Sequence, residues 1–385
     1  MNLKEEIEKL DKNLTASVGE ECIEVGHKDF LFDYDFERLE NDEDTLAKIK
    51  DFISIKYDVG KSIQKKDYFE VVVGISNYYM YGGFDEEPKI EVTNVDGQDL
   101  HFSIGDISED FEKFLRETIH WDNFSPEYFS SLKIFNADLV LKIEENKLDY
   151  SEIYSQLIQN IFFDLHHKYG LQIDLIDLSD EEKYETYYWD EEELGPIETT
   201  KISFGEYDFD LVSYYNRASN MSKSEFQYLA YFQVLECIFD EVYKFETIQD
   251  VKGILQANWF SKSSNENIDS LIGIVDRYNK DKNDRNKTKL VLEKYFKGDL
   301  HDEAYYLVNK EIIEVLIEIK QIKKEEELKD LQKIANIIYD FRCECTHSNR
   351  SYPIKHTTII SNDNLEQYIT LIRKIAERII LNYRG

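Results

Sequence analysis

Arg342 and His347 are the residues of this chain whose types and spacing best fit catalysis. A guanidinium binds phosphate oxygens through two parallel hydrogen bonds, and an imidazole titrates near neutral pH. The two groups suit RNA cleavage, because the 2′-OH of RNA supplies the nucleophile and the protein need only move protons and stabilise charge. On an unbroken helix the two side chains would point about 140° apart. We therefore expect the helix to bend or unwind between Glu344 and His347.

The stretch 331–347 has the pattern of an amphipathic helix. Its apolar residues recur at intervals of three and four and form one stripe: Leu331, Ile334, Ile338 and Phe341. Arg342 and His347 come where this stripe ends. The turn-forming residues 348–353 follow and favour a break in the helix.

A local cationic patch spans residues 342–356. Besides Arg342 and His347 it contains Arg350, Lys355 and His356, against Glu344 alone. We expect these last three cations to bind substrate phosphates. Arg350 and His356 have a spacing similar to that of the first pair, but they lie on either side of Pro353 outside any helical pattern, so we do not interpret them as catalytic.

The acidic charge belongs to the first half of the chain. Residues 1–200 contain 19 Lys and Arg against 49 Asp and Glu, a net charge of −30, whereas residues 201–385 contain 27 against 30, a net charge of −3. This change in net charge between the two halves predicts a domain boundary near residue 200. It also leaves the second half able to bind a short RNA, although the total charge of −33 disfavours long-range attraction of nucleic acid.

The composition predicts a cytoplasmic protein without cofactor or metal. The four cysteines cannot form a disulfide framework or a four-ligand zinc site at their spacing. No apolar run reaches the 18 or more residues of a membrane helix, and the N-terminus is too polar for a signal peptide. We expect no association with a membrane.

Residues 1–200 have the pattern of an α+β domain. Apolar residues alternate over 30–36, and β-branched or aromatic residues fill 68–74 and 89–94, so an antiparallel sheet is expected. A helix follows from Ser151, its expected N-cap, to Gly170 at the C′ position. The acidic stretch 178–199 is interpreted as a linker or exposed loop.

Residues 201–385 have the pattern of an all-α bundle of five or six helices. Ser222 and Glu225 form an expected capping box that opens a helix over 226–239, which is apolar on nearly every side. Glu236 lies within that helix and needs a partner if it is buried, for which Arg342 is the obvious cation. The alternative is a Glu236 on a narrow exposed strip. Further helices are expected at 268–278, 287–296, 303–323 and from 361 to near the end.

The segment Tyr228–Glu236, followed much later by Ile338–His347 and one closing helix, resembles the HEPN superfamily of prokaryotic helical domains. The resemblance covers about residues 205–385. It implies a HEPN-like bundle that acts as a metal-independent endoribonuclease and a homodimer, often in anti-phage, abortive-infection or toxin systems. His347 would be the general acid or base, Arg342 would hold the phosphate, and Glu236 would orient one of them. The chain departs from the family at Cys343, where active relatives carry a polar residue, and this concerns the efficiency of catalysis.

Two other functional hypotheses remain open from the sequence. The first is a non-catalytic HEPN module that binds nucleotide, RNA or a protein partner. The second is a different enzyme in the first half, where we find no glycine-rich phosphate loop, His-Glu-x-x-His motif or nucleophile elbow. We expect residues 1–200 to sense or bind a phage or regulatory protein and to restrain the helical domain. The alternative is an acidic domain that only makes the protein soluble.

Overall fold

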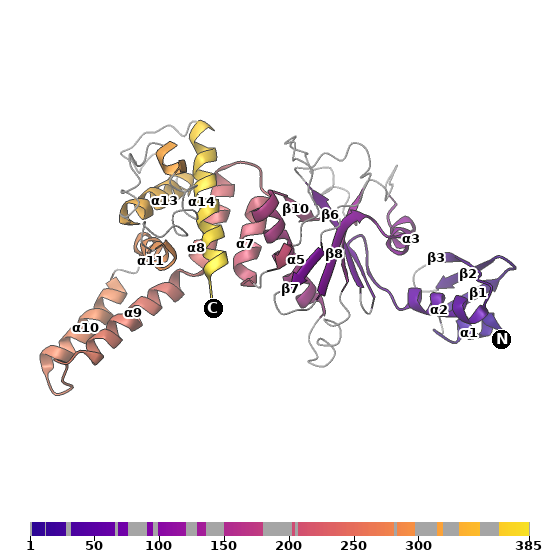
Figure 1. Cartoon of the computed structure of the whole chain (residues 1–385), viewed down its shortest axis with the longest axis horizontal. Coiled ribbons are helices and arrows are strands. Elements are labelled where there is room, and N and C mark those ends of the chain that lie inside the picture. The colour runs from indigo at the N-terminus through magenta and orange to yellow at the C-terminus, as the bar shows by residue number, and fades with distance from the viewer. Residues whose placement is uncertain are drawn as a thin grey trace. The chain divides into compact units, whose positions relative to one another are not determined.

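The chain folds as two compact units, Met1–Gly205 and Glu206–Gly385, in a computed structural model (Figure 1). The structure describes residues 2–11, 13–27, 32–65, 68–75, 91–94, 99–120, 129–135, 150–179, 202–204, 207–280, 283–296, 314–318, 331–346 and 362–384. The expected order of fold classes is confirmed, since antiparallel sheets with short helices precede a mostly helical region. No described helix combines the length and apolar character that a membrane span needs.

The first unit begins with a small antiparallel sheet in the order β1-β2-β3. The elements of this part are α1 (Leu3–Glu8), β1 (Leu14–Val18), β2 (Cys22–His27), β3 (Phe32–Glu37) and α2 (Asp42–Ile53). Tyr34 and Phe36 alternate with exposed residues and are buried, as the sequence predicted for this strand. They pack with Phe52 of α2 in edge-to-face ring contacts.

A larger sheet has the order β11-β7-β8-β9-β6-β5-β4, with β10 also paired to β6. All described pairings are antiparallel except that of β11 with β7. Its strands are β4 (Lys56–Asp58), β5 (Ser62–Gln64), β6 (Tyr68–Ile75), β7 (Glu91–Asn94), β8 (Asp99–Asp106), β9 (Ser130–Phe135), β10 (Ile173–Leu175) and β11 (Ile202–Phe204). The strand expected over 68–74 is thereby confirmed, and so is the part of the strand expected over 89–94 that lies within the described residues, 91–94.

Helices cover both faces of this sheet because the residues of β6 alternate between two cores. Val72 belongs to the core that contains the apolar side of α3 (Glu109–Thr118), whereas Val71 and Val73 belong to the core of α5 (Tyr150–Tyr169). Gly170 follows α5 with a positive φ of 71°, which confirms its expected C′ position. Ser151 is not the N-cap, since α5 already includes Tyr150.

The helical unit is built around α8, which packs against α7, α13 and α14 (Figure 1). Its helices are α7 (Phe209–Ser219), α8 (Glu225–Cys237), α9 (Phe239–Gln256), α10 (Asn265–Lys280), α11 (Asp284–Phe296), α13 (Leu331–Thr346) and α14 (Asn362–Asn382). Tyr228, Phe232 and Leu235 are almost fully buried, as predicted for a helix that is apolar on most sides.

Several local predictions in this unit were wrong. Ser224, not Ser222, caps α8, because the Ser224 side chain accepts a hydrogen bond from the backbone N–H of Gln227. Helices α7 and α9 were not predicted, whereas the helix predicted at 268–278 is confirmed and is longer than expected, as α10. Of the helix expected over 303–323, the structure describes 314–318, which are helical.

Candidate functional site

Arg342 and Glu236 form an ion pair in which Nη2 lies 3.2 Å from Oε1. Arg342 is in the last two turns of α13, and Glu236 is the second-last residue of α8. Their side chains are 24% and 35% exposed, so the pair lies at the rim of the core, and the guanidinium carbon lies 5.9 Å from the centroid of the Phe232 ring. The predicted contact between these two residues is confirmed.

Arg342 is charged with or without this ion pair, because a guanidinium stays protonated at physiological pH. Burial by itself would lower the pKa of the guanidinium, but the adjacent Glu236 carboxylate, with smaller contributions from Cys343 and Tyr339, shifts this pKa above its ordinary value. A cation that is fixed in charge and in position is suited to bind a phosphate oxygen. The recorded bond to Glu236 uses one of the five N–H donors of the guanidinium.

The aromatic core positions the two helices that carry this pair. The Tyr228 hydroxyl of α8 donates a 2.8 Å hydrogen bond to the Ile338 carbonyl of α13, and the Tyr228 ring meets that of Phe341 edge to face. Phe341 in turn stacks on Tyr368 of α14, with centroids 3.8 Å apart. Because Phe341 is held in the core, Arg342 emerges about 100° further around α13, at the rim.

The helix α13 continues through Thr346, whose hydroxyl donates to the carbonyl oxygens of Arg342 and Cys343. The expected unwinding therefore does not occur at Glu344 or Cys345, and convergence with Arg342 would require the chain to turn directly after Thr346. His347 lies outside the described residues, as do Arg350, Lys355 and His356.

A second guanidinium, that of Arg285 in α11, lies against α13. It is 4.9 Å from the centroid of the Tyr339 ring, donates a 3.1 Å hydrogen bond to Asn336, and forms a 2.5 Å ion pair with Asp340. The sequence analysis missed Arg285, since 55 residues separate it from Asp340 and no local motif marks it. Arg285 fixes the outer side of α13 to α11.

Cys345 is a structural cysteine. Burial, followed by the charges of Glu225 and Glu344, raises the pKa of its thiol to about 12. The thiol is therefore neutral at physiological pH and a poor nucleophile. Within the described ranges, no three side chains of His, Cys, Asp or Glu are grouped as metal ligands.

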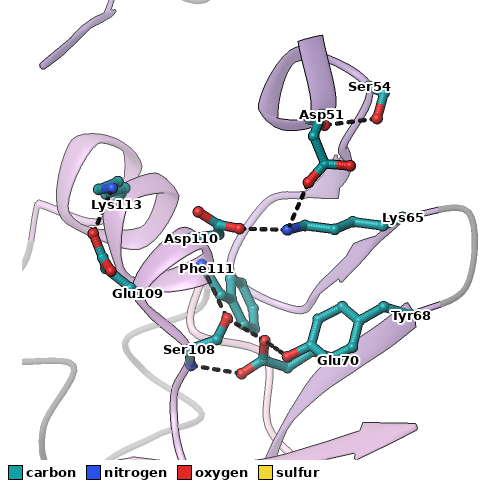
Figure 2. A network of polar contacts seen from close by, with 10 residues as sticks. All are labelled: Asp51, Ser54, Lys65, Tyr68, Glu70, Ser108, Glu109, Asp110, Phe111 and Lys113. Carbon is teal, nitrogen blue, oxygen red and sulfur yellow. Dashed lines mark hydrogen bonds and ion pairs between the residues drawn. The ribbon is translucent and has the colours of Figure 1, made fainter. Parts of the chain in front are cut away.

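The first unit contains a separate polar cluster around Glu70, which is fully buried on β6 (Figure 2). The Glu70 carboxylate accepts hydrogen bonds from the backbone N–H of Ser108 at 2.8 Å and from the Ser131 hydroxyl at 2.6 Å. The hydroxyls of Ser108 and Tyr68 also donate to it. Sequence reasoning missed this cluster as well.

The Glu70 cluster anchors the start of α3. Ser108 is the N-cap of that helix, and its hydroxyl accepts from the Phe111 N–H while donating to Glu70. Nearby, the Lys65 ammonium bridges Asp110 at 2.5 Å and Asp51 at 3.3 Å (Figure 2). A negative charge beside a helix N-terminus is favourable, so the arrangement is explained by stability.

Comparisons of the chain with protein-family models, curated proteins and solved structures find no match. The resemblance to the HEPN superfamily therefore rests on the residues themselves.

Proposed function

We propose that the helical unit is a metal-independent endoribonuclease in which Arg342 holds the scissile phosphate and His347 moves the proton. The observation that carries the proposal is the 3.2 Å ion pair between Glu236 and Arg342 at the end of α13, because it fixes the guanidinium close to the point where the chain continues into His347. Glu236 orients Arg342 and does not touch the reacting atoms.

The reaction follows from the chemistry of RNA. The 2′-oxygen attacks phosphorus, the bond from phosphorus to the 5′-oxygen breaks, and the products are a 2′,3′-cyclic phosphate and a 5′-hydroxyl. The proton of the 2′-OH goes to a base and the leaving oxygen takes one from an acid. One imidazole must perform both steps in turn, whereas a homodimer through the helical domain would supply two.

The remaining parts of the proposal concern substrate and control. Arg350, Lys355 and His356 bind further phosphates of the RNA. The acidic first unit binds a phage or regulatory protein and restrains the nuclease, since the net charge of −30 over residues 1–200 competes with RNA for a cationic groove. The protein acts in the cytoplasm as an anti-phage, abortive-infection or toxin-like nuclease.

The test is cleavage of end-labelled RNA by the purified full chain in the presence of EDTA. Wild type should leave 2′,3′-cyclic phosphate ends and spare the same sequence in DNA. His347→Ala and Arg342→Ala should each lower the rate by about 10²-fold or more. His120→Ala, a change at an exposed histidine of the first unit, is the matched control and should leave the rate unchanged.

Equal rates for wild type and His347→Ala would contradict the assignment. RNA binding that depends on Arg342 without any cleavage would instead identify the alternative, a non-catalytic binding module. Two observations favour this second function: the cysteine at position 343, and the ion pair in which the negative charge of Glu236 offsets the attraction of Arg342 for phosphate.

A further inference from the structure

Helices α9 and α10 form an antiparallel hairpin that extends beyond the other helices of its unit (Figure 1). Its base is fixed in two ways. Tyr243 of α9 stacks on Tyr278 of α10 with centroids 4.9 Å apart, and its hydroxyl donates a 3.0 Å hydrogen bond to the Tyr278 carbonyl. Lys287 of α11 forms a 2.6 Å ion pair with Asp240 in the first turn of α9.

Large apolar side chains of this hairpin are exposed rather than buried. Six of them lie on the two helices and are each 40% to 52% exposed: Phe245, Ile248, Leu255, Ile268, Ile272 and Val275. Ile248 and Leu255 form one stripe on α9, and Ile268, Ile272 and Val275 form one on α10, at intervals of three, four and seven residues. Phe245 lies about 60–80° further around α9, where the Lys294 ammonium of α11 is 5.6 Å from its ring centroid. Trp259, in the connection between the helices, is 60% exposed. Isolated exposed apolar residues are ordinary, but a continuous set of them marks an interaction surface.

The two stripes lie on the same face of the hairpin. At about 100° per residue, Ile248 and Leu255 are turned by about 120–140° from Tyr243 on α9. On α10, Ile268, Ile272 and Val275 are turned by about 60–120° from Tyr278, counted in the same direction from the N-terminus to the C-terminus of the helix. The two helices run in opposite directions and their tyrosines face each other. A rotation counted in the same way along both sequences therefore brings both stripes to the same side of the hairpin. We call this surface the hairpin face.

Charged residues border the hairpin face with opposite sign on its two edges. Lys252 lies at the edge of α9 that is turned away from α10, and Asp269 lies at the edge of α10 that is turned away from α9. The stacking of Tyr243 on Tyr278 sets these two residues at about the same level along the hairpin. Within the part of the chain that the structure describes, neither residue forms an ion pair.

We propose that the hairpin face binds the same face of a second copy of this chain, giving an antiparallel four-helix bundle. With the two-fold axis parallel to the helices, α9 lies over the partner's α10, and every neighbouring pair of helices is antiparallel. Lys252 then meets the partner's Asp269, and the same pair forms a second time by symmetry. A two-fold axis perpendicular to the helices would instead place α9 over the partner's α9. Lys252 would then lie on the same edge as the partner's Lys252, which is unfavourable.

The size of the surface suits a stable dimer. The 18 residues of α9 span about 27 Å, and two helices side by side are about 20 Å wide, so the face measures roughly 500 Å² in projection. The accessible surface of packed side chains is larger than its projection and approaches the value for a standard interface, about 800 Å² per partner. The hairpin face is formed by α9 and α10 and not by α13, so this inference does not depend on the nuclease.

The first test is the oligomeric state of the full chain by sedimentation equilibrium. Wild type should be a dimer at micromolar concentration, and Ile272→Glu should be a monomer with an unchanged circular dichroism spectrum, since Ile272 is exposed in the single chain. Ser270→Glu places the same charge on the opposite side of α10 and should remain dimeric. A monomeric wild type, or an Ile272→Glu protein that stays dimeric, overturns the proposal.

The second test identifies the symmetry by exchanging charges. Lys252→Glu and Asp269→Lys should each weaken the homodimer by about tenfold, because each creates two like-charge pairs. When the two variants are mixed, the heterodimer regains two attractive pairs. One joins the carboxylate introduced at position 252 to the ammonium introduced at position 269, and the other is the unchanged pair of Lys252 with Asp269.

Heterodimers should therefore form with an affinity close to that of wild type. No recovery on mixing overturns the parallel two-fold axis, and with it the proposed face-to-face bundle. Binding of the wild-type chain to lipid vesicles as a monomer would also contradict it.

Discussion

Glu236 and Arg342 are 106 residues apart in the sequence and form an ion pair of 3.2 Å between α8 and α13. The pair lies where both helices end, beside the aromatic contacts that join them. Both side chains remain partly exposed, so the guanidinium is accessible to a ligand and the ion pair is accessible to water. The ion pair has two roles to distinguish, which are stabilising the contact between the helices and orienting Arg342 for a ligand. Each can be measured independently.

The first prediction concerns the coupling energy of this ion pair. A double-mutant cycle with Glu236→Gln and Arg342→Gln, measured by urea unfolding, should give at most about 1 kcal/mol, because the pair is accessible to water and salt. If Glu236 orients Arg342 for catalysis, Glu236→Gln should lower RNA cleavage by about tenfold or more with little loss of stability. A coupling of several kcal/mol would show that the pair is structural.

The second prediction concerns Glu70, which is fully buried and accepts four hydrogen bonds. Glu70→Gln should lower the free energy of unfolding of the first unit by about 1–3 kcal/mol, since an amide nitrogen would face donors that need an acceptor. The matched control is Glu109→Gln on the exposed side of α3, which should change it by less than about 0.5 kcal/mol. Equal effects of the two substitutions would contradict the anchoring role. Urea unfolding with hydrogen exchange of α3 measures both.

The third prediction concerns pH. Burial, followed by the nearby Cys345, Tyr368 and Cys343, raises the pKa of Tyr228 well above its ordinary value, and burial likewise raises the pKa of Tyr215. Unfolding frees these phenols to ionise near pH 10, whereas the folded state holds them neutral. The stabilising contribution is therefore complete below about pH 10 and decreases as the pH rises further.

The Tyr228→Phe variant tests this explanation. It should lose about 1 kcal/mol at neutral pH, because the hydrogen bond to Ile338 is absent, and its free energy of unfolding should fall less steeply above about pH 10. Urea unfolding across the alkaline range, from about pH 8 to about pH 11, provides the measurement. A slope identical to that of wild type would show that Tyr228 does not contribute to the alkaline loss of stability.

Much of the helical unit was predictable from local pattern. The intervals of Ile334, Ile338 and Phe341 identified the buried side of α13, and the apolar residues around α8 identified a central helix. From these two predictions, the partner of Glu236 followed, since a carboxylate in a buried helix requires a cation. The errors were local: Ser222 and Ser224 both fit a cap by residue type, and only the backbone geometry distinguishes them. Helix α9 was missed because only its first residues, Phe239, Val242 and Tyr243, are buried. The rest of the helix does not show the regular apolar spacing of a helix that packs on a core along its whole length.

The sequence by itself determined the order of the two fold classes, the division of charge near residue 200 and the apolar faces of the main helices. These features depend on backbone periodicity and on the transfer of apolar side chains from water, which act over a few residues. Only the tertiary structure decided that Glu70 meets Ser131, that Arg285 stacks on Tyr339, and that the stripes of α9 and α10 share one face. Each of these depends on which distant segments pack together, and no short-range pattern records that choice.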